Sequence, residues 1–210
     1  MDKKISVIIP AHNEEKYIAK TIGALNENKI PFELIVVCDS CLDNTYQVAK
    51  NYGQNVYNVD FKNVSKTRNY GVEKSSGNIL VFVDADTIVS ENYFEEILKT
   101  TENYDYGCAK WISESKTILG KYIALVTNNY NKKNIGGNFF VKKDLFQKVG
   151  GFNENMKMGE DTDLGDRLKK IKARYCFMKN CYIIPSERKY QENGYLFLII
   201  KSIINGLLYK

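Results

Sequence analysis

Two aspartates separated by one residue follow the apolar segment 80–83, and their carboxylates are suited to chemistry. Asp84 and Asp86 carry like charges that repel each other unless a positive group lies nearby. Side chains two apart in an extended chain face the same side, so both can point into one crevice. Mg²⁺ and Mn²⁺ prefer carboxylate ligands and usually share them with substrate phosphates. The pair indicates a divalent cation, and a solvated turn is the open alternative.

The elements that would position these aspartates form a strand–helix repeat in the first 90 residues. Apolar runs rich in β-branched residues predict buried strands at 5–9, 33–38 and 78–83. A weaker strand is expected at 55–59. Helices are expected after an N-cap at Asn13, from Asp43 onward and over 65–74. This alternation predicts a parallel sheet with helices on both faces.

Polar clusters follow three of these strands, at 11–14, 39–40 and 84–86. Ligands of parallel α/β sheets lie beyond the carboxyl ends of the strands, so the three clusters should converge on one crevice. The second half is less regular. We expect a strand at 138–141, helices at 144–149 and 160–170, weak alternation over 174–184 and an apolar helix over 195–209.

Composition places the chain among ordinary globular proteins, since 44% of its 210 residues are hydrophobic and 26% are charged. The net charge of +5 fits an anionic small molecule or membrane surface and is too diffuse for nucleic acid. We find neither a signal peptide nor a membrane-spanning run, so a cytoplasmic location is expected. Five cysteines leave a zinc or redox site as a minor alternative, through Cys38 with Cys41 or Cys176 with Cys181.

Five segments in a fixed order carry a family resemblance: SVIIPAHNE, ELIVVCDSCLDNT, KTRNYG, GNILVFVDADT and GEDTDL. Together they resemble family 2 of the inverting GT-A glycosyltransferases, and the match covers about residues 5–170. The resemblance implies a Rossmann-like α/β fold, with a mostly parallel central sheet flanked by helices and a smaller acceptor-side region in the second half. It implies one domain over 1–210, with a nucleotide-sugar-binding half (1–90), an acceptor-side half (91–194) and a C-terminal apolar helix (195–210).

The resemblance assigns the nucleobase and ribose of the donor to the loop with Pro10, His12 and Glu14, and to Asp39. Asp39 can accept a hydrogen bond from a base N–H, and His12 can stack its ring on the base. Many relatives carry a tyrosine near the position of His12, so the base stays open between UDP- and GDP-sugars. An exposed loop imidazole is the simpler reading of His12.

The diphosphate and its cation are assigned by the same resemblance. Arg68 would grip phosphate oxygens bidentately. Asp84 would contact the ribose or a metal-bound water, and Asp86 would ligate Mn²⁺ or Mg²⁺ directly. Arg188 lies in Ser-Glu-Arg-Lys, where some relatives carry Ser-x-Arg-Arg that helps hold the phosphates; a solvated basic turn is the alternative.

The resemblance places catalysis at Glu160 and Asp161, with Asp161 as the general base that deprotonates the acceptor hydroxyl. Ordinary acidic capping of a helix is compatible with that role. Gly136, Gly137 and Asn138 would line the acceptor side, where backbone must approach the sugar closely.

The acceptor expected from the resemblance is a glycan or a lipid-linked molecule. Segment 195–210 is too short to span a bilayer, and we expect it to pack on the core, on a second chain in a homodimer, or peripherally at the inner face of the membrane. Two alternative functions remain. A non-catalytic nucleotide-sugar-binding homologue would keep the fold, whereas a nucleotidyltransferase should show a glycine-rich basic loop after the first strand, and PAHNEE has neither glycine nor base.

Overall fold

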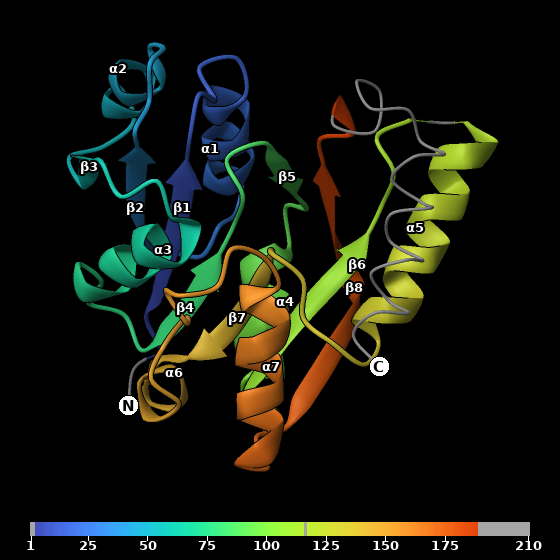
Figure 1. Ribbon diagram of the computed structural model, residues 1–210. Helices are drawn as coiled ribbons and strands as arrows, with labels where there is room; N and C mark the ends of the chain where they lie inside the picture. The colour runs from blue at the N-terminus through green and yellow to red at the C-terminus, as the bar shows by residue number, and fades with distance from the viewer. Residues whose placement is uncertain (1–2, 116, 189–210) are drawn as a thin grey trace.

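A single mixed sheet of eight strands crosses the molecule in the order β3-β2-β1-β4-β7-β6-β8-β5 (Figure 1). The computed structural model describes residues 3–115 and 117–188. In the first half β1 (Ile5–Ala11) pairs in parallel with β2 (Phe32–Asp39) and β4 (Ile79–Phe82), and β2 pairs in parallel with β3 (Val56–Val59). The predicted α/β class and the parallel arrangement of these four strands are confirmed.

The second half of the sheet introduces antiparallel pairs. β7 (Phe139–Lys142) runs antiparallel to both β4 and β6 (Tyr106–Trp111), while β8 (Tyr175–Pro185) is parallel to β6 and antiparallel to the edge strand β5 (Thr87–Val89). Four of the seven pairings are therefore parallel.

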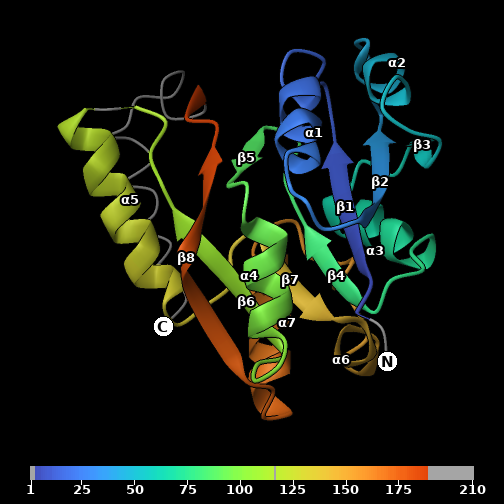
Figure 2. The same ribbon diagram turned by 180° about the vertical axis from the view of Figure 1, so that it is seen from behind.

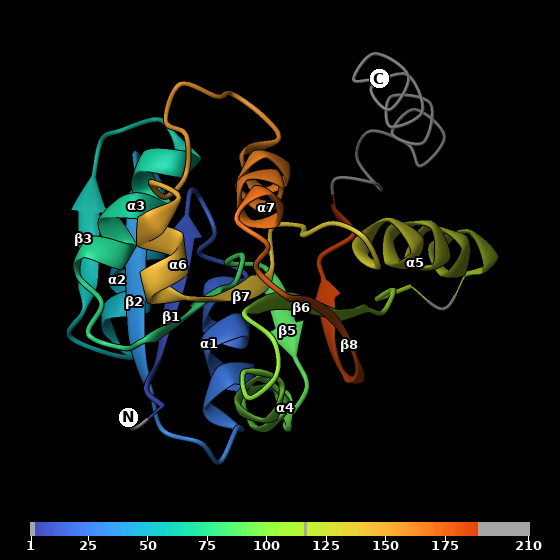
Figure 3. The ribbon, with the colours of Figure 1, turned by 90° about the horizontal axis from the view of Figure 1, so that it is seen from below.

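Helices cover both faces of the sheet (Figures 2 and 3). One face carries α1 (Ile18–Asn26), α2 (Thr45–Lys50) and α4 (Tyr93–Thr100), and the other carries α3 (Val64–Glu73), α6 (Lys143–Lys148) and α7 (Glu160–Lys170). α5 (Ile118–Asn131) lies at the end of the molecule beside β6.

The two-residue period of the strands divides the core into two clusters. Ile5, Val7 and Ile9 of β1 pack with the helices of the α1 face, whereas Ile8 packs in the cluster that contains residues of α3, α6 and α7. A strand apolar on both faces must be covered on both faces, which is why helices flank this part of the sheet on each side.

Two predicted boundaries are wrong. α1 begins at Ile18, because Asn13 adopts a left-handed backbone (φ 56°) and its Oδ1 accepts a hydrogen bond from the Leu42 N–H instead of capping a helix. The strand expected to reach residue 83 ends at Phe82, and the chain turns so that the Thr87 N–H bonds to the carbonyl of Asp84.

Four elements were absent from the sequence prediction, namely β5, α4, β6 and α5. The apolar segment 195–210 lies outside the described residues. Among the residues that are described, no helix is long and apolar enough to cross a membrane.

All five cysteines are free, and burial raises the pKa of Cys38 to about 12. The described part of the chain also contains no cluster of three or more histidine, cysteine, aspartate or glutamate side chains arranged to hold a metal. Neither observation supports the zinc or redox alternative, since reactive and metal-binding cysteines act as thiolates.

Candidate active site

A cavity of about 1390 Å³ lies at the carboxyl ends of β1, β2 and β4, where the sequence predicted that three polar clusters would meet. The convergence is confirmed. Nine of the predicted site residues line this cavity: Pro10, His12, Glu14, Asp39, Arg68, Asp84, Asp86, Gly137 and Glu160. The other four do not line it: Gly136, Asn138, Asp161 and Arg188.

The rim of the cavity holds three non-glycine residues with left-handed backbone, which the sequence analysis did not find. Asn13 (φ 56°), Ser40 (φ 54°) and Lys62 (φ 52°) each lie in the loop that follows one of the strands β1, β2 and β3. Such conformations are uncommon and cluster at functional sites, where the surrounding structure holds them. Ser40 and Lys62 are of residue types that rarely adopt a left-handed backbone, so their sequence gives no turn signal at these positions.

Asp39 organises the loop that closes one side of the cavity. Its Oδ1 accepts hydrogen bonds from the N–H groups of Phe61 (2.7 Å) and Lys62 (2.9 Å), and its Oδ2 accepts from the Asn63 N–H (3.0 Å) and the Thr67 hydroxyl (2.8 Å). Burial opposes ionisation, but these bonds to the carboxylate prevail and lower the pKa of Asp39. Its predicted contact with the nucleobase is a separate role that would share these oxygens.

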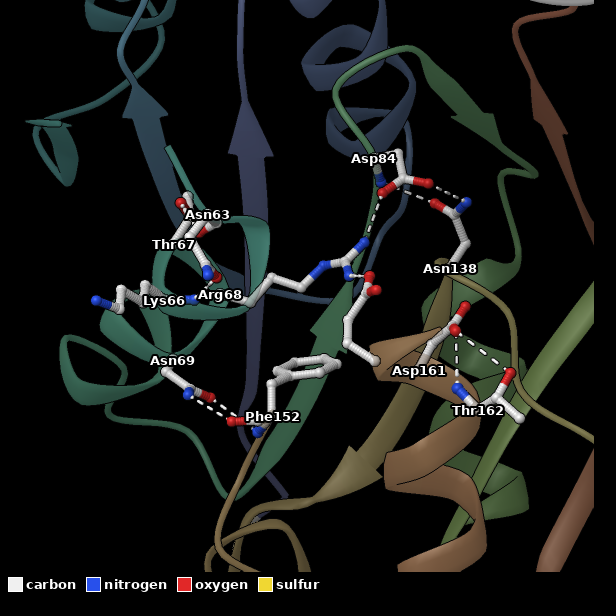
Figure 4. Close-up of polar contacts among 11 residues, drawn as sticks. Asn63, Lys66, Thr67, Arg68, Asn69, Asp84, Asn138, Phe152, Asp161 and Thr162 are labelled. Carbon is white, nitrogen blue, oxygen red and sulfur yellow. Dashed lines mark hydrogen bonds and ion pairs between the residues drawn. The ribbon is translucent and has the colours of Figure 1, made fainter. Parts of the chain in front are cut away.

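The buried Arg68 forms the centre of a group that we call the inner cluster, defined as Arg68, Asp84 and Glu160. Figure 4 shows the contact of Arg68 with Asp84. The Nη1 atom of Arg68 lies 2.6 Å from Glu160 Oε1 and its Nη2 lies 3.1 Å from Asp84 Oδ1. The guanidinium also stacks over the ring of Phe152, 5.3 Å from the centroid. Only 5% of the Arg68 side chain is exposed, and its buried Nε–H has no hydrogen-bond partner among the described residues.

Asp84 is held by the loop before β7. Asn138 accepts a hydrogen bond from the Asp84 N–H (2.8 Å) and donates one to Asp84 Oδ2 (3.0 Å), as Figure 4 shows. A Cβ on Gly137 would lie 2.8 Å from Asp84 Oδ2, closer than real Cβ atoms approach. The glycine and the asparagine were predicted to line the acceptor side, and in this structure they position Asp84.

Asp86 belongs to a second group, the outer cluster, defined as Arg188, Asp86, Glu14 and Tyr17. Arg188 Nη2 lies 3.3 Å from Asp86 Oδ2 and also forms an ion pair with Glu14, while its guanidinium stacks 4.6 Å from the ring centroid of Tyr17. The hydrogen bond to Glu14 raises the pKa of Arg188. Arg188 thus contacts two residues of the cavity wall although it does not line the cavity itself.

Asp161 follows Glu160 at the start of α7 and interacts electrostatically with Glu160, Arg68 and Asp84. Its Oδ1 accepts a hydrogen bond from the Thr162 N–H (2.7 Å), and the Thr162 hydroxyl pairs with Tyr130 Oη (2.8 Å). Burial and the neighbouring Glu160 carboxylate raise the pKa of Asp161, which makes it a stronger base than an exposed aspartate.

His12 is exposed on the loop after β1, in keeping with its simpler reading. Its Nδ1 lies 2.7 Å from the carbonyl oxygen of Asp39, so the Nδ1–H donates and Nε2 is free to accept from Asn13 (3.3 Å). This contact ties the loops after β1 and β2 together beside Pro10.

A helix-flanked mixed sheet with a cavity at the carboxyl ends of its parallel strands is the arrangement in which α/β proteins bind their ligands. The chain matches the family described as glycosyl transferase family 2 over residues 6–158, and it belongs to that family. It is similar to the minor teichoic acid biosynthesis protein GgaB of Bacillus subtilis, 27% identical over 83% of this chain and 22% of that protein. It is also similar to 4,4'-diaponeurosporenoate glycosyltransferase of Staphylococcus haemolyticus, 35% identical over 50% of this chain and 30% of the relative.

Solved structures share the fold. TarS 1-349 of S. aureus, solved in complex with UDP-GlcNAc, has a TM-score of 0.71 at 21% identity over 88% of this chain and 59% of that one. The mannosyltransferase PcManGT of Pyrobaculum calidifontis, solved with GDP-Man and Mn²⁺, has a TM-score of 0.72 at 16% identity over 88% and 57%. The chain therefore spans well under two thirds of the length of these relatives.

Proposed function

We propose that this chain transfers a sugar from a nucleoside diphosphate sugar to a hydroxyl group of a glycan or lipid-linked acceptor, with inversion at the anomeric carbon. The observation that carries the proposal is the meeting of the Asp84–Asp86 turn, Arg68 and Glu160 at one cavity, although they come from three separate parts of the chain. Family membership and the donor sugars in the related structures support it.

The electrostatic balance of the cavity favours a divalent cation as part of the donor complex. Six carboxylates line the cavity against only two basic side chains, Lys62 and Arg68. A diphosphate brings further negative charge, and like charges in a partly desolvated site are costly. Mg²⁺ or Mn²⁺ bound by Asp86, with Asp84 close by, fits this chemistry because such ions use one or two carboxylates and take other ligands from substrate phosphates. When bound, the ion would neutralise charge that develops on the leaving diphosphate.

The two arginines have distinct parts in this proposal. Arg68 is held in place by its carboxylate partners, so its charge would stabilise the leaving diphosphate without reorganisation of the side chain. Arg188 must exchange Asp86 for a phosphate oxygen, since its Nη2 contacts that carboxylate at 3.3 Å.

Asp161 is proposed as the general base that takes the proton from the acceptor hydroxyl. Inversion requires the acceptor to attack from the side opposite the leaving diphosphate, and Asp161 adjoins Glu160, which lines the donor cavity, without lining that cavity itself. Its raised pKa strengthens it as a base.

The proposal is tested by a panel of UDP- and GDP-sugars with Mn²⁺, with and without chelator, in which release of nucleoside diphosphate is measured. At least one donor should be turned over, and the chelator should suppress the reaction. Asp161→Asn should lower turnover by about 10²–10⁴-fold, the range for a general base, and leave UDP or GDP binding nearly unchanged.

The matched control is Asp163→Asn, which changes the same type of residue in the same turn of α7. Asp163 forms its ion pair with Arg167 (2.7 Å) and does not line the cavity, so turnover should be retained. Full turnover by Asp161→Asn would contradict the base assignment. Donor binding without turnover by any sugar would instead favour the non-catalytic homologue, and release of pyrophosphate would favour a nucleotidyltransferase.

A further inference from the structure

α5 presents an unusual apolar surface, which we call the α5 face and define as Ile118, Leu119, Tyr122, Leu125, Val126 and Tyr130. All six side chains are exposed, with 89% of Ile118 and 58% of Leu125 accessible. Their spacing of three to four residues places them on one side of the helix. A contiguous exposed patch of this kind marks a surface that another group covers.

The opposite side of α5 contacts the sheet through one large apolar residue, Ile123, together with small and polar residues. The Asn128 side chain donates to the Trp111 carbonyl (2.9 Å) and accepts from the Trp111 N–H (2.8 Å), so it extends the hydrogen bonding of β6. Gly120 packs so closely on Ser113 and Ser115 that a Cβ there would collide. These contacts fix the rotation of α5 so that the α5 face points outward.

The described chain ends beside the N-terminal end of α5. Glu187 is fully buried and its Oε1 accepts a hydrogen bond from the Ser113 hydroxyl. Thr117 caps the helix only four residues after Ser113, with its hydroxyl accepting from the Gly120 N–H (3.1 Å). The last described residues, Glu187 and Arg188, thus lie near the place where α5 begins.

The chemistry of the following residues matches that of the α5 face. In segment 195–210, 11 of 16 residues are aliphatic or aromatic. The six residues 189–194 can reach about 20 Å. Helix α5, with 14 residues, is about 21 Å long, and a segment of 16 residues is long enough to run along it. We propose that residues 195–210 of the same chain cover the α5 face.

This docking gives the C-terminal segment a role at the donor cavity. Arg188 immediately precedes it and contacts Asp86 and Glu14. A segment anchored on α5 restricts the position of Arg188, so it acts as a positioning element for the outer cluster. This consequence rests on the proposed function, whereas the docking itself does not.

Photo-crosslinking of the full chain tests the docking directly. With p-benzoylphenylalanine at Leu125, illumination should yield a species of monomer mass in which peptides from 195–210 are joined to α5, as identified by mass spectrometry. The control places the same group at Glu95 of α4, whose side chain is 57% exposed, and it should give no such product. Crosslinks only at dimer mass, crosslinks only to phospholipid when vesicles are added, or no α5 crosslink at all would each overturn the proposal.

UDP binding by titration calorimetry tests the consequence for Arg188. Leu125→Glu places a charge on the α5 face and should weaken UDP binding several-fold with Mn²⁺ present, while Glu95→Gln on α4 should leave it unchanged. The positioning role would be wrong, and the docking would stand, if Leu125→Glu binds UDP with unchanged affinity while the chain with p-benzoylphenylalanine at Leu125 still crosslinks to residues 195–210. A wild-type chain that binds no nucleotide would contradict the proposed function instead.

Discussion

The inner and outer clusters are built from the same chemical groups and yet differ in how firmly they are held. Each places one arginine between carboxylates and over an aromatic ring, with Arg68 on Phe152 and Arg188 on Tyr17. Arg68 is 5% exposed and comes from the middle of α3, whereas Arg188 is 20% exposed and follows the last strand. The two neighbouring aspartates of one turn therefore belong to two different environments.

The difference indicates that Arg68 is held in one position, whereas Arg188 can change its partners. A buried arginine that loses its partners leaves an unpaired charge, so the inner cluster should resist rearrangement. The Arg188 side chain is 20% exposed against 5% for Arg68, so water can replace part of its pairing and Arg188 can exchange Asp86 for another anion more readily. The following predictions test this contrast.

Arg68→Met should have the largest effect on stability. It leaves Asp84 and Glu160 close together without their shared cation, and removing one partner of a buried pair costs about 3–5 kcal/mol. Urea unfolding followed by circular dichroism measures the free energy of unfolding. A loss below about 1 kcal/mol would show that the inner cluster does not hold Arg68 in one position.

Gly137→Ala should destabilise the chain by about 1–3 kcal/mol, because the new Cβ would lie 2.8 Å from Asp84 Oδ2 and would displace a carboxylate held by Asn138. Gly136→Ala is the matched control, since its Cβ would meet no atom closer than 3.6 Å. Thermal unfolding of the two variants should separate them, and equal melting temperatures would contradict the close approach at Gly137.

Arg188→Met should weaken UDP binding about tenfold, the loss of one hydrogen bond to a charged group, while the free energy of unfolding changes by less than about 1 kcal/mol. Calorimetric titration and urea unfolding measure the two quantities. Arg167→Met on α7 serves as the control, because its half-buried pair with Asp163 lies away from the cavity and UDP binding should be retained. A large loss of stability in Arg188→Met would remove the contrast with Arg68.

The smallest expected effect is a pH-dependent gain in stability in Asp161→Asn, about 0.5 kcal/mol at pH 7. Burial and Glu160 raise the pKa of Asp161 in the folded chain, so its charged form destabilises the native state at neutral pH. The gain should shrink as the pH falls below that raised pKa and vanish below the ordinary pKa of aspartate, where Asp161 is protonated in both the folded and the unfolded chain. Unfolding free energies measured between pH 4 and 8 check the sign, and a loss of stability at pH 7 would contradict it.

Much of the nucleotide half could be predicted because its signals are local. The strand-forming runs around β1, β2 and β4 are apolar on both faces, and the polar residues after them mark the strand ends. β6 and α5 were missed for a physical reason. β6 contains glycine, cysteine and lysine, which do not form an apolar strand pattern. Most large apolar residues of α5 face outward, so a prediction that places apolar residues in the core does not fit this helix.

The site shows the same limit at the level of single residues. Asn138 was noticed, but its role in holding Asp84 depends on the antiparallel pairing of β4 with β7, which joins residues about 60 positions apart. Likewise, the ion pair of Arg188 with Glu14 joins the two ends of the described chain. Contacts between residues so far apart in the sequence produce no periodicity or spacing from which they could be predicted.

By itself, the sequence determined the α/β class, the order of the first strands and the set of acidic and basic residues gathered at their ends, because hydrophobic periodicity and strand polarity act over a few residues. Only the tertiary structure decided how the charges are paired. Asp84 pairs with Arg68 and Asp86 pairs with Arg188, because the chain turns after Phe82 and the two carboxylates face different elements. Pairing of charges is a property of distance and burial in space, and these arise only when remote segments pack together.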